Sequence, residues 1–167
     1  MSSFEEALRE FYSGEVLGET FYSALLPSAR NADERLKLGT LLQLETETKA
    51  WLRAPMVSRG VSIEEQMADR HKGLALADQI KPLSWSELIQ GLRDGIAAHY
   101  VPLYQGFADA ARARGRADEE AICLYMVEHE GAQIEFARRE LAGATPSQSL
   151  EPVVKFLRYS LERSMDR

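Results

Sequence analysis

The sequence predicts an all-α protein, an up-down four-helix bundle with one long crossover and an extra C-terminal helix. Apolar residues recur at helical spacing along most of the chain. β-branched residues are sparse, and no Asn-Gly or Asp-Gly hairpin signal occurs. Tight turns join the first long segment to the second and the third to the fourth, whereas a long connection separates the two pairs. That spacing is typical of a bundle with one crossover.

Cap residues and prolines define the first two long helices. Ser3, followed three residues later by a glutamate, has the pattern of a capping box and predicts a helix over residues 3–26. Pro27 is expected to end it. Pro55 is expected in the same way to end a second helix over residues 31–54, because the residue before a proline disfavours helical geometry.

The crossover covers residues 57–83 and is expected to contain a short helix near residues 63–80, capped by Ser62. Ser84 then caps a third long helix over residues 85–114.

Gly115 closes that third helix. A fourth long helix follows over residues 117–142, and a short amphipathic helix is expected over residues 152–165. We therefore expect a bundle over residues 1–145, with residues 146–167 packed on it.

Composition and charge exclude several classes of binding partner and metal site. The chain has 167 residues, a length that suits one core, and a formal net charge of −6 without a block of Lys or Arg. We therefore expect no nucleic-acid or anionic-membrane partner. The single cysteine, Cys123, excludes an intrachain disulfide and a cysteine-based metal site. No apolar run approaches the roughly 20 residues of a membrane span.

Two further expectations concern location and assembly. The opening residues lack the basic and apolar regions of a secretion signal, so a cytoplasmic location is expected. The long acidic faces of the bundle make a homodimer the expected assembly.

Each long helix places an acid or a histidine near the middle of a mainly apolar stripe: Glu15, Glu45, His99, and the adjacent His129 and Glu130. A buried carboxylate costs several kcal/mol unless it is paired or bound to a cation. Several facing one another need protons or a metal, and carboxylates with imidazole suit iron or manganese. The alternative is pairing with arginines on the same helices, which are Arg9, Arg53, Arg93 and Arg138.

Short motifs on these helices resemble those of rubrerythrins and related ferritin-like di-iron carboxylate proteins. Gly14-Glu15 is followed seven residues later by Tyr22, Glu45 begins a segment similar to the Glu-x-x-His helix of that family, and His129-Glu130 precedes Phe-Ala-Arg. The resemblance implies a ferritin-like topology and oxidation chemistry in which O₂ or peroxide binds at iron. It implies Glu15 and Glu45 as metal ligands, with His129 or Glu130 from the fourth long helix. Tyr22 or Gln133 would be next to the ligands.

The sequence departs from the family pattern at both ligand pairs. Thr48 stands where the second helix should carry a histidine. In the fourth long helix, one register places Met126 on the expected glutamate, and the other places Gln133 on the expected histidine. A regular two-metal site is therefore absent, and two alternatives stay open, a single metal bound through Glu15, Glu45, His129 or Glu130, or no metal. Further candidate ligands are Glu19, Asp94, His99, Thr48 and Gln133.

Three hypotheses follow. The first is a metal-dependent oxidoreductase with iron, or else manganese, in the bundle core. The second is a metal-free ferritin-like bundle that acts as a binding or dimerising protein. The third is a heme-oxygenase-like fold with a small-molecule pocket, in which His99 or His129 binds a cofactor.

Overall fold

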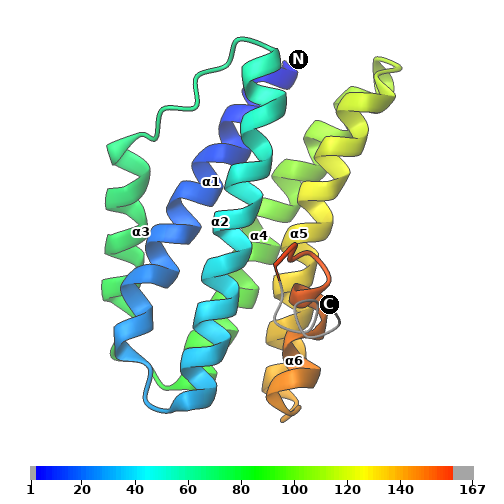
Figure 1. Cartoon of the computed structure of the whole chain (residues 1–167). Helices are drawn as coiled ribbons and strands as arrows, with labels where there is room; N and C mark the ends of the chain where they lie inside the picture. The colour runs from blue at the N-terminus through cyan, green and yellow to red at the C-terminus, as the bar shows by residue number, and fades with distance from the viewer. Residues whose placement is uncertain (1–2, 160–167) are drawn as a thin grey trace.

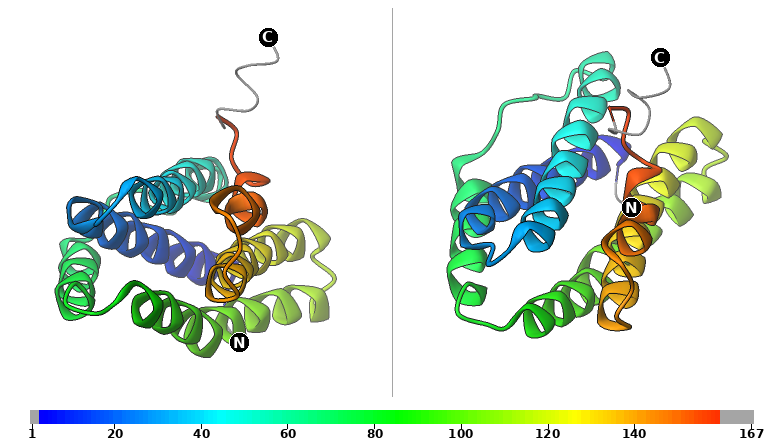
Figure 2. Two further views of the ribbon diagram at one scale, coloured as in Figure 1. Left: turned by 90° about the horizontal axis from the view of Figure 1, so that it is seen from below. Right: turned by 60° about the horizontal axis from the view of Figure 1, so that its bottom comes forward.

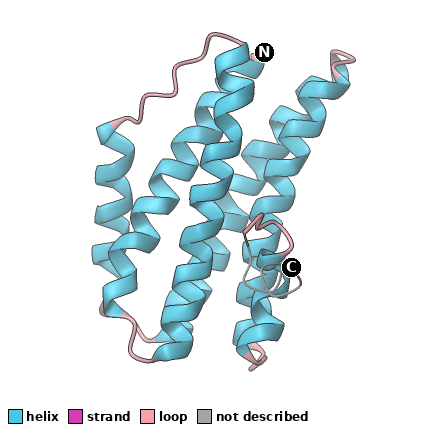
Figure 3. Ribbon diagram, in the orientation of Figure 1, coloured by secondary structure: helices cyan, strands magenta, loops and turns pink. Residues whose placement is uncertain are grey.

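The computed structural model describes residues 3–159, and this part of the chain is helical without a strand (Figure 3). This confirms the predicted all-α class. The elements in chain order are α1 (Phe4–Leu25), the 3-10 turn η1 (Leu26–Ser28), α2 (Ala32–Ser58), α3 (Met67–Ile80), α4 (Trp85–Ala113), α5 (Ala117–Leu141) and α6 (Pro146–Val154).

The helices form two hairpins joined by the crossover (Figure 1). One hairpin pairs α1 with α2, and the other pairs α4 with α5. Helix α3 belongs to the crossover and packs on the flank of α1. Helix α6 packs on α5 and also reaches α2, which closes that side of the molecule (Figure 2). Helices α1 and α4 touch at only a few points. Their side chains therefore determine how much space is left between them.

Capping residues set the helix ends as predicted. Ser3 and Ser84 each accept a hydrogen bond from the backbone N–H of the glutamate three residues on, and each glutamate accepts one in return. These reciprocal bonds satisfy donors that the first helical turn leaves free. Gly115 closes α4 with a φ of 68°, a left-handed conformation that favours glycine.

The predicted end of the second helix is wrong, because α2 continues through Pro55 to Ser58. A proline in the last turn removes one backbone hydrogen bond, and the turn persists through bonds such as the one from Arg59 N–H to the Met56 carbonyl. The crossover helix begins at Met67 rather than near residue 63. Ser62 does not cap it and instead accepts a bond from Glu64 N–H.

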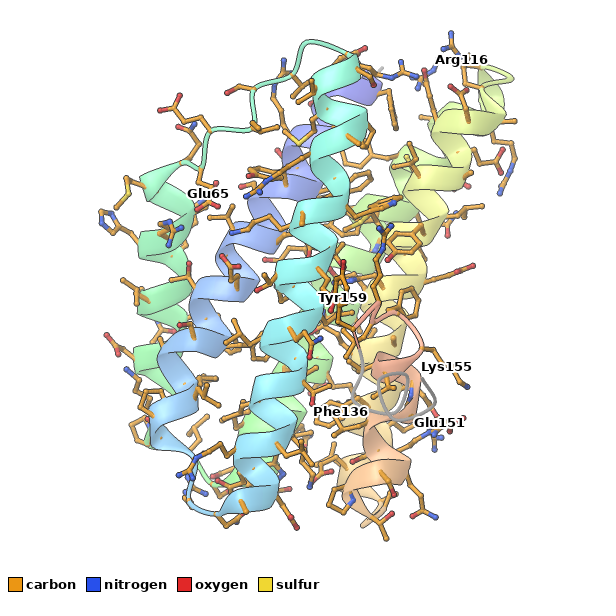
Figure 4. All side chains as sticks on the ribbon, viewed as in Figure 1. Glu65, Arg116, Phe136, Glu151, Lys155 and Tyr159 are labelled. Carbon is orange, nitrogen blue, oxygen red and sulfur yellow. The ribbon has the colours of Figure 1, made fainter. Side chains whose placement is uncertain are left out.

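The C-terminal helix also lies elsewhere than predicted. It spans Pro146–Val154, whereas the expectation was residues 152–165, of which 160–165 lie outside the described residues. Thr145 forms a capping box with Gln148, and a proline occupies the first turn, where its missing N–H costs nothing. These local signals start the helix earlier. At its C-terminal end, Glu151 of α6 pairs with Lys155 on the outer side of the helix (Figure 4).

The buried side chains form two apolar clusters along the bundle. One contains Phe11, Leu52 and Met126, and the other contains Leu44 and Phe136 among its members. Buried polar side chains lie where these clusters meet, and they are Glu15 of α1, Glu45 and Thr48 of α2, and His129, Glu130 and Gln133 of α5. A polar layer therefore crosses an otherwise apolar interior. In the described part of the chain, no helix has the length and apolarity required to cross a membrane.

Candidate metal centre

Three helices bring Glu15 of α1, Glu45 of α2 and His129 of α5 together in the polar layer. His129 Nε2 lies 3.5 Å from Glu15 Oε1 and 3.4 Å from Glu45 Oε1. One ligand atom from each residue falls within 4.8 Å of the other two. All three side chains are buried, and that of His129 is fully enclosed. The sequence analysis predicted these three residues as ligands, and the structure places them side by side.

A polar contact at the second ring nitrogen, Nδ1, orients the His129 ring. Thr48 Oγ1 of α2 lies 3.2 Å from His129 Nδ1. If Nδ1–H donates to this hydroxyl, Nε2 keeps its lone pair and faces the two carboxylates, as a metal ligand must. Phe156 covers the ring edge-on, with centroids 6.4 Å apart. Thr48, predicted as a possible ligand, thus lies on the far side of the imidazole.

Glu45 reaches the layer through a gap that a glycine leaves in α1. A Cβ atom at Gly18 would overlap the Glu45 carboxylate, so a larger residue there would displace it. The Gln133 amide then donates to Glu45 Oε1 at 2.9 Å. The position of this carboxylate therefore depends on a residue of α1 and on another of α5.

Gln133 connects the carboxylates to a tyrosine. The Tyr22 hydroxyl donates to Gln133 Oε1 at 2.6 Å, which orients the amide NH₂ toward Glu45. The same NH₂ lies 3.2 Å from His129 Nε2 and 3.5 Å from Glu130 Oε2. Tyr22 and Gln133 are therefore neighbours of the ligand group, as the resemblance implied.

The acids of this layer outnumber its one basic group. Burial is the largest effect on the Glu15 carboxyl, and it raises the pKa well above the ordinary value, assisted by Glu45 and Glu130. For His129, burial acts to lower the pKa, but Glu15 and Glu45 outweigh it and raise the pKa to about 10. Three carboxyl groups thus face one imidazole, and within residues 3–159 Glu15 Oε2 is buried without a hydrogen-bond partner.

Arginines do not compensate these acids. Arg93 pairs with Asp94, and Arg138 pairs with Glu135. Within residues 3–159, no lysine or arginine ion pair to Glu15, Glu45 or Glu130 is found. The alternative of pairing between the core acids and arginines on the same helices is therefore not what the structure shows.

Glu130 is buried beside the three-residue group but outside it. Burial, with the neighbouring Glu45, raises its pKa to about 8, although His129 acts in the opposite direction. Its carboxylate lines a cavity of about 370 Å³ between α1, α3 and α4, which Glu45 and Gln133 also line. The two predicted acids Glu45 and Glu130 thus meet the same cavity.

The remaining candidate ligands lie outside the group. Glu19 is half-buried, pairs with Lys49, and accepts a bond from Thr46. Asp94 is exposed and pairs with Arg93. Exposure to water removes the electrostatic need for a cation at Asp94, and Lys49 already neutralises Glu19. His99 is exposed and lines the cavity without joining the ligand atoms.

Two features of the site were not predicted. Gly14 and Gly18 on α1, and Gly91 and Gly95 on α4, all line the cavity, and each pair is spaced i,i+4 on one helix face. Glycines repeated at that spacing inside long helices are the sequence signal that could have revealed it. The second feature is the Tyr104 hydroxyl, which is buried and has no hydrogen-bond partner in the part of the chain that the structure describes.

Comparison of the chain with protein-family models, curated proteins and solved structures finds no match. The chemistry of the site therefore has to be argued from its own residues and their geometry.

Proposed function

We propose that this protein is a ferritin-like bundle that binds one divalent metal ion through Glu15, Glu45 and His129 and uses it for oxidation chemistry. The observation that carries the proposal is the meeting of three buried carboxyl groups and one imidazole in the polar layer. Among the residues that the structure describes, Glu15 Oε2 is buried there without a hydrogen-bond partner. A buried acid in this situation needs a proton or a cation.

The two distances from the imidazole to the carboxylates fit a single ion. Metal bonds to carboxylate oxygen and imidazole nitrogen of about 2.0–2.2 Å limit two ligand atoms of one ion to about 4.4 Å apart. The distances from His129 Nε2 to Glu15 and Glu45, 3.5 and 3.4 Å, are within that limit. Iron or manganese accepts both donor types. The family pattern has histidines at the positions of Thr48 and Gln133. Without those histidines, the layer lacks the ligands of a regular second metal.

The surrounding residues support such a site. Thr48 fixes the imidazole so that Nε2 faces the carboxylates, and Tyr22 orients Gln133, whose amide steadies Glu45. Burial excludes bulk water, and the adjoining cavity gives access from one side. When bound, iron would supply the capacity to take up O₂ or peroxide and to exchange electrons.

The arrangement of the helices supports the ferritin-like part of the proposal. Two antiparallel hairpins, α1 with α2 and α4 with α5, are joined by a long crossover that carries α3. The proposed ligands project from three of the four long helices into the interior, which is how metal sites are built in bundles of this class.

Elemental analysis of protein purified without chelators tests the proposal. We expect close to one iron or manganese per chain, and Glu45→Ala should abolish it. Glu128→Ala is the matched control, because Glu128 is exposed on the same helix as His129. Full metal content in Glu45→Ala would refute the ligand assignment, and metal-free protein that takes up neither Fe²⁺ nor Mn²⁺ would refute the function.

A metal-free bundle that dimerises is the second candidate, and one observation favours it. The Gln133 amide already donates to Glu45 and lies near His129 Nε2, so it partly fills the place between the donors. In this case Fe²⁺ or Mn²⁺ leaves the melting temperature unchanged. In the haem-binding hypothesis His129 is a poor ligand, because it is enclosed and does not line the cavity, whereas His99 does line it.

A further inference from the structure

We infer that the cavity between α1, α3 and α4 binds a small apolar primary amine, with its ammonium group on Glu130 and its apolar body between the helices. This goes beyond the proposed metal site, because binding of the amine does not require the metal. Where a metal is bound, the amine would lie next to it, since Glu45 and Gln133 also line the cavity.

The size and walls of the cavity suit a small molecule. Its volume of about 370 Å³ falls within the range of ligand pockets, near the lower end. Most of the wall is apolar and comes from α1, α3 and α4, with Phe21, Leu76 and Ile96 as examples. Tyr22 and Tyr100 add aromatic rings near the acidic end. Such rings favour a neighbouring ammonium through cation–π attraction.

The open space is created by glycines. Added Cβ atoms at Gly91 and Gly95 of α4 would meet no atom within 4 Å. Inside a long helix, each glycine costs about 1 kcal/mol relative to alanine. Two glycines on the same face, both bordering the cavity, therefore keep open a volume that ordinary side chains would fill.

The charges of the cavity select the ligand. Glu130 is 6% exposed, lines the cavity, and its one hydrogen bond within residues 3–159 is the 3.5 Å contact from Gln133. Glu45 adds a second carboxylate, and no lysine or arginine is among the lining residues described. An anionic ligand would lie against two acids without a lysine or arginine among the described lining residues, whereas an ammonium can donate to the Glu130 carboxyl group, which is otherwise nearly unpartnered.

Three probes of similar size separate the effect of charge from that of the apolar body. They are 2-phenylethylamine, 2-phenylethanol and phenylacetate. Their binding is measured by calorimetry, with protein as purified and after treatment with chelator. We expect the amine to bind both forms, the alcohol to bind at least about tenfold more weakly, and phenylacetate not to bind. Binding of the amine to the metal-depleted form keeps this test separate from the metal proposal.

Two variants locate the site. Glu130→Gln should reduce the affinity for the amine to that for the alcohol and leave the alcohol unchanged, while Glu128→Gln, exposed on the same helix, changes neither. Gly95→Leu fills the cavity and should abolish binding of both. Gly106→Leu is its control, because Gly106 is exposed on the same helix, is not a lining residue, and has equal space around it.

Three results would overturn the inference. The first is that none of the three probes binds, and the second is equal binding of amine and alcohol to the unmodified protein. The third is binding that survives Gly95→Leu. If light scattering then shows a shift from dimer to monomer in that variant, a second copy covers the cavity instead.

Discussion

A single buried residue shows how the site depends on its neighbours. His129 is fully enclosed, yet both ring nitrogens have polar groups beside them, Thr48 at Nδ1 and the carboxylates at Nε2. The imidazole is held by α2 on one side and faces α1 and α2 on the other. Its role as a ligand therefore depends on hydrogen bonding that holds one tautomer.

A substitution at Gly18 tests whether metal binding depends on the position of the Glu45 carboxylate. Gly18→Ala puts a methyl group where the Glu45 carboxylate lies, so the carboxylate must move away from His129. We expect a loss of about 10–100-fold in metal affinity, the usual effect of disturbing a residue that positions a ligand. Gly95→Ala is the control, because its methyl group meets no atom within 4 Å. Equal affinities in titrations of the two variants with Mn²⁺ would contradict this.

The acids of the layer predict how stability varies with pH. Glu130 has a pKa raised from 4.5 to about 8, so the folded chain keeps a proton that the unfolded chain releases between these values. His129, raised from 6.5 to about 10, acts in the same direction at higher pH. The free energy of unfolding of the metal-free protein should therefore fall as pH rises from about 5 to 8.

Urea unfolding at pH 5, 6.5 and 8 after chelator treatment measures this fall. Glu130→Gln cannot lose a proton in this range, so its stability should depend less on pH, whereas Glu128→Gln should behave as the unmodified chain does. Stability of the unmodified metal-free protein that increases over this range would show that the folded chain does not retain these protons.

At the scale of single elements, local sequence signals determine most helix ends. Ser3, Ser84 and Thr145 each begin a helix with a reciprocal capping box. Pro55 shows the limit of such signals, because a proline near a helix end can be accommodated in the last turn. Caps supply hydrogen bonds directly, whereas a proline removes only one.

Removal of one cap should have a measurable cost. Ser84→Ala deletes the hydroxyl that accepts from Glu87 N–H and is expected to lower the free energy of unfolding by about 1 kcal/mol. Ser86→Ala serves as the control, because Ser86 is also exposed and lies in the first turn of the same helix. Its substitution should change the free energy of unfolding by about 0.5 kcal/mol at most. Urea denaturation compares them, and equal stabilities would show that the cap contributes nothing.

At the scale of the whole molecule, the ligand atoms come from helices far apart in sequence. Glu15, Glu45 and His129 belong to α1, α2 and α5, so an ion bound to all three links both hairpins. Binding that requires the folded arrangement stabilises the fold by mass action.

Mn²⁺ provides a test without redox chemistry. At about 100 times its Kd, an ion should add about 2.7 kcal/mol, or about 5–10 °C in Tm for a chain of this size. The unmodified protein should show this shift in calorimetry, and Glu45→Ala should not. A similar shift in both would mean that the ion binds outside the proposed group.

The sequence by itself determined the all-α class, the long helices and the buried acids Glu15, Glu45 and Glu130, because apolar periodicity and capping residues act within a few residues. It did not separate Glu130 and Gln133 from the ligand group, since both occur in the same motif as His129. The homodimer and the cytoplasmic location remain predictions.

Only the tertiary structure decided which acids meet. Glu19 and Glu15 are one turn apart on α1, yet one pairs with Lys49 and the other points into the layer. The cavity also required the structure, because Gly91 and Gly95 open a space only when α1 and α3 surround it. Helical spacing fixes which residues share a face, but the packing of one helix against another decides what that face meets.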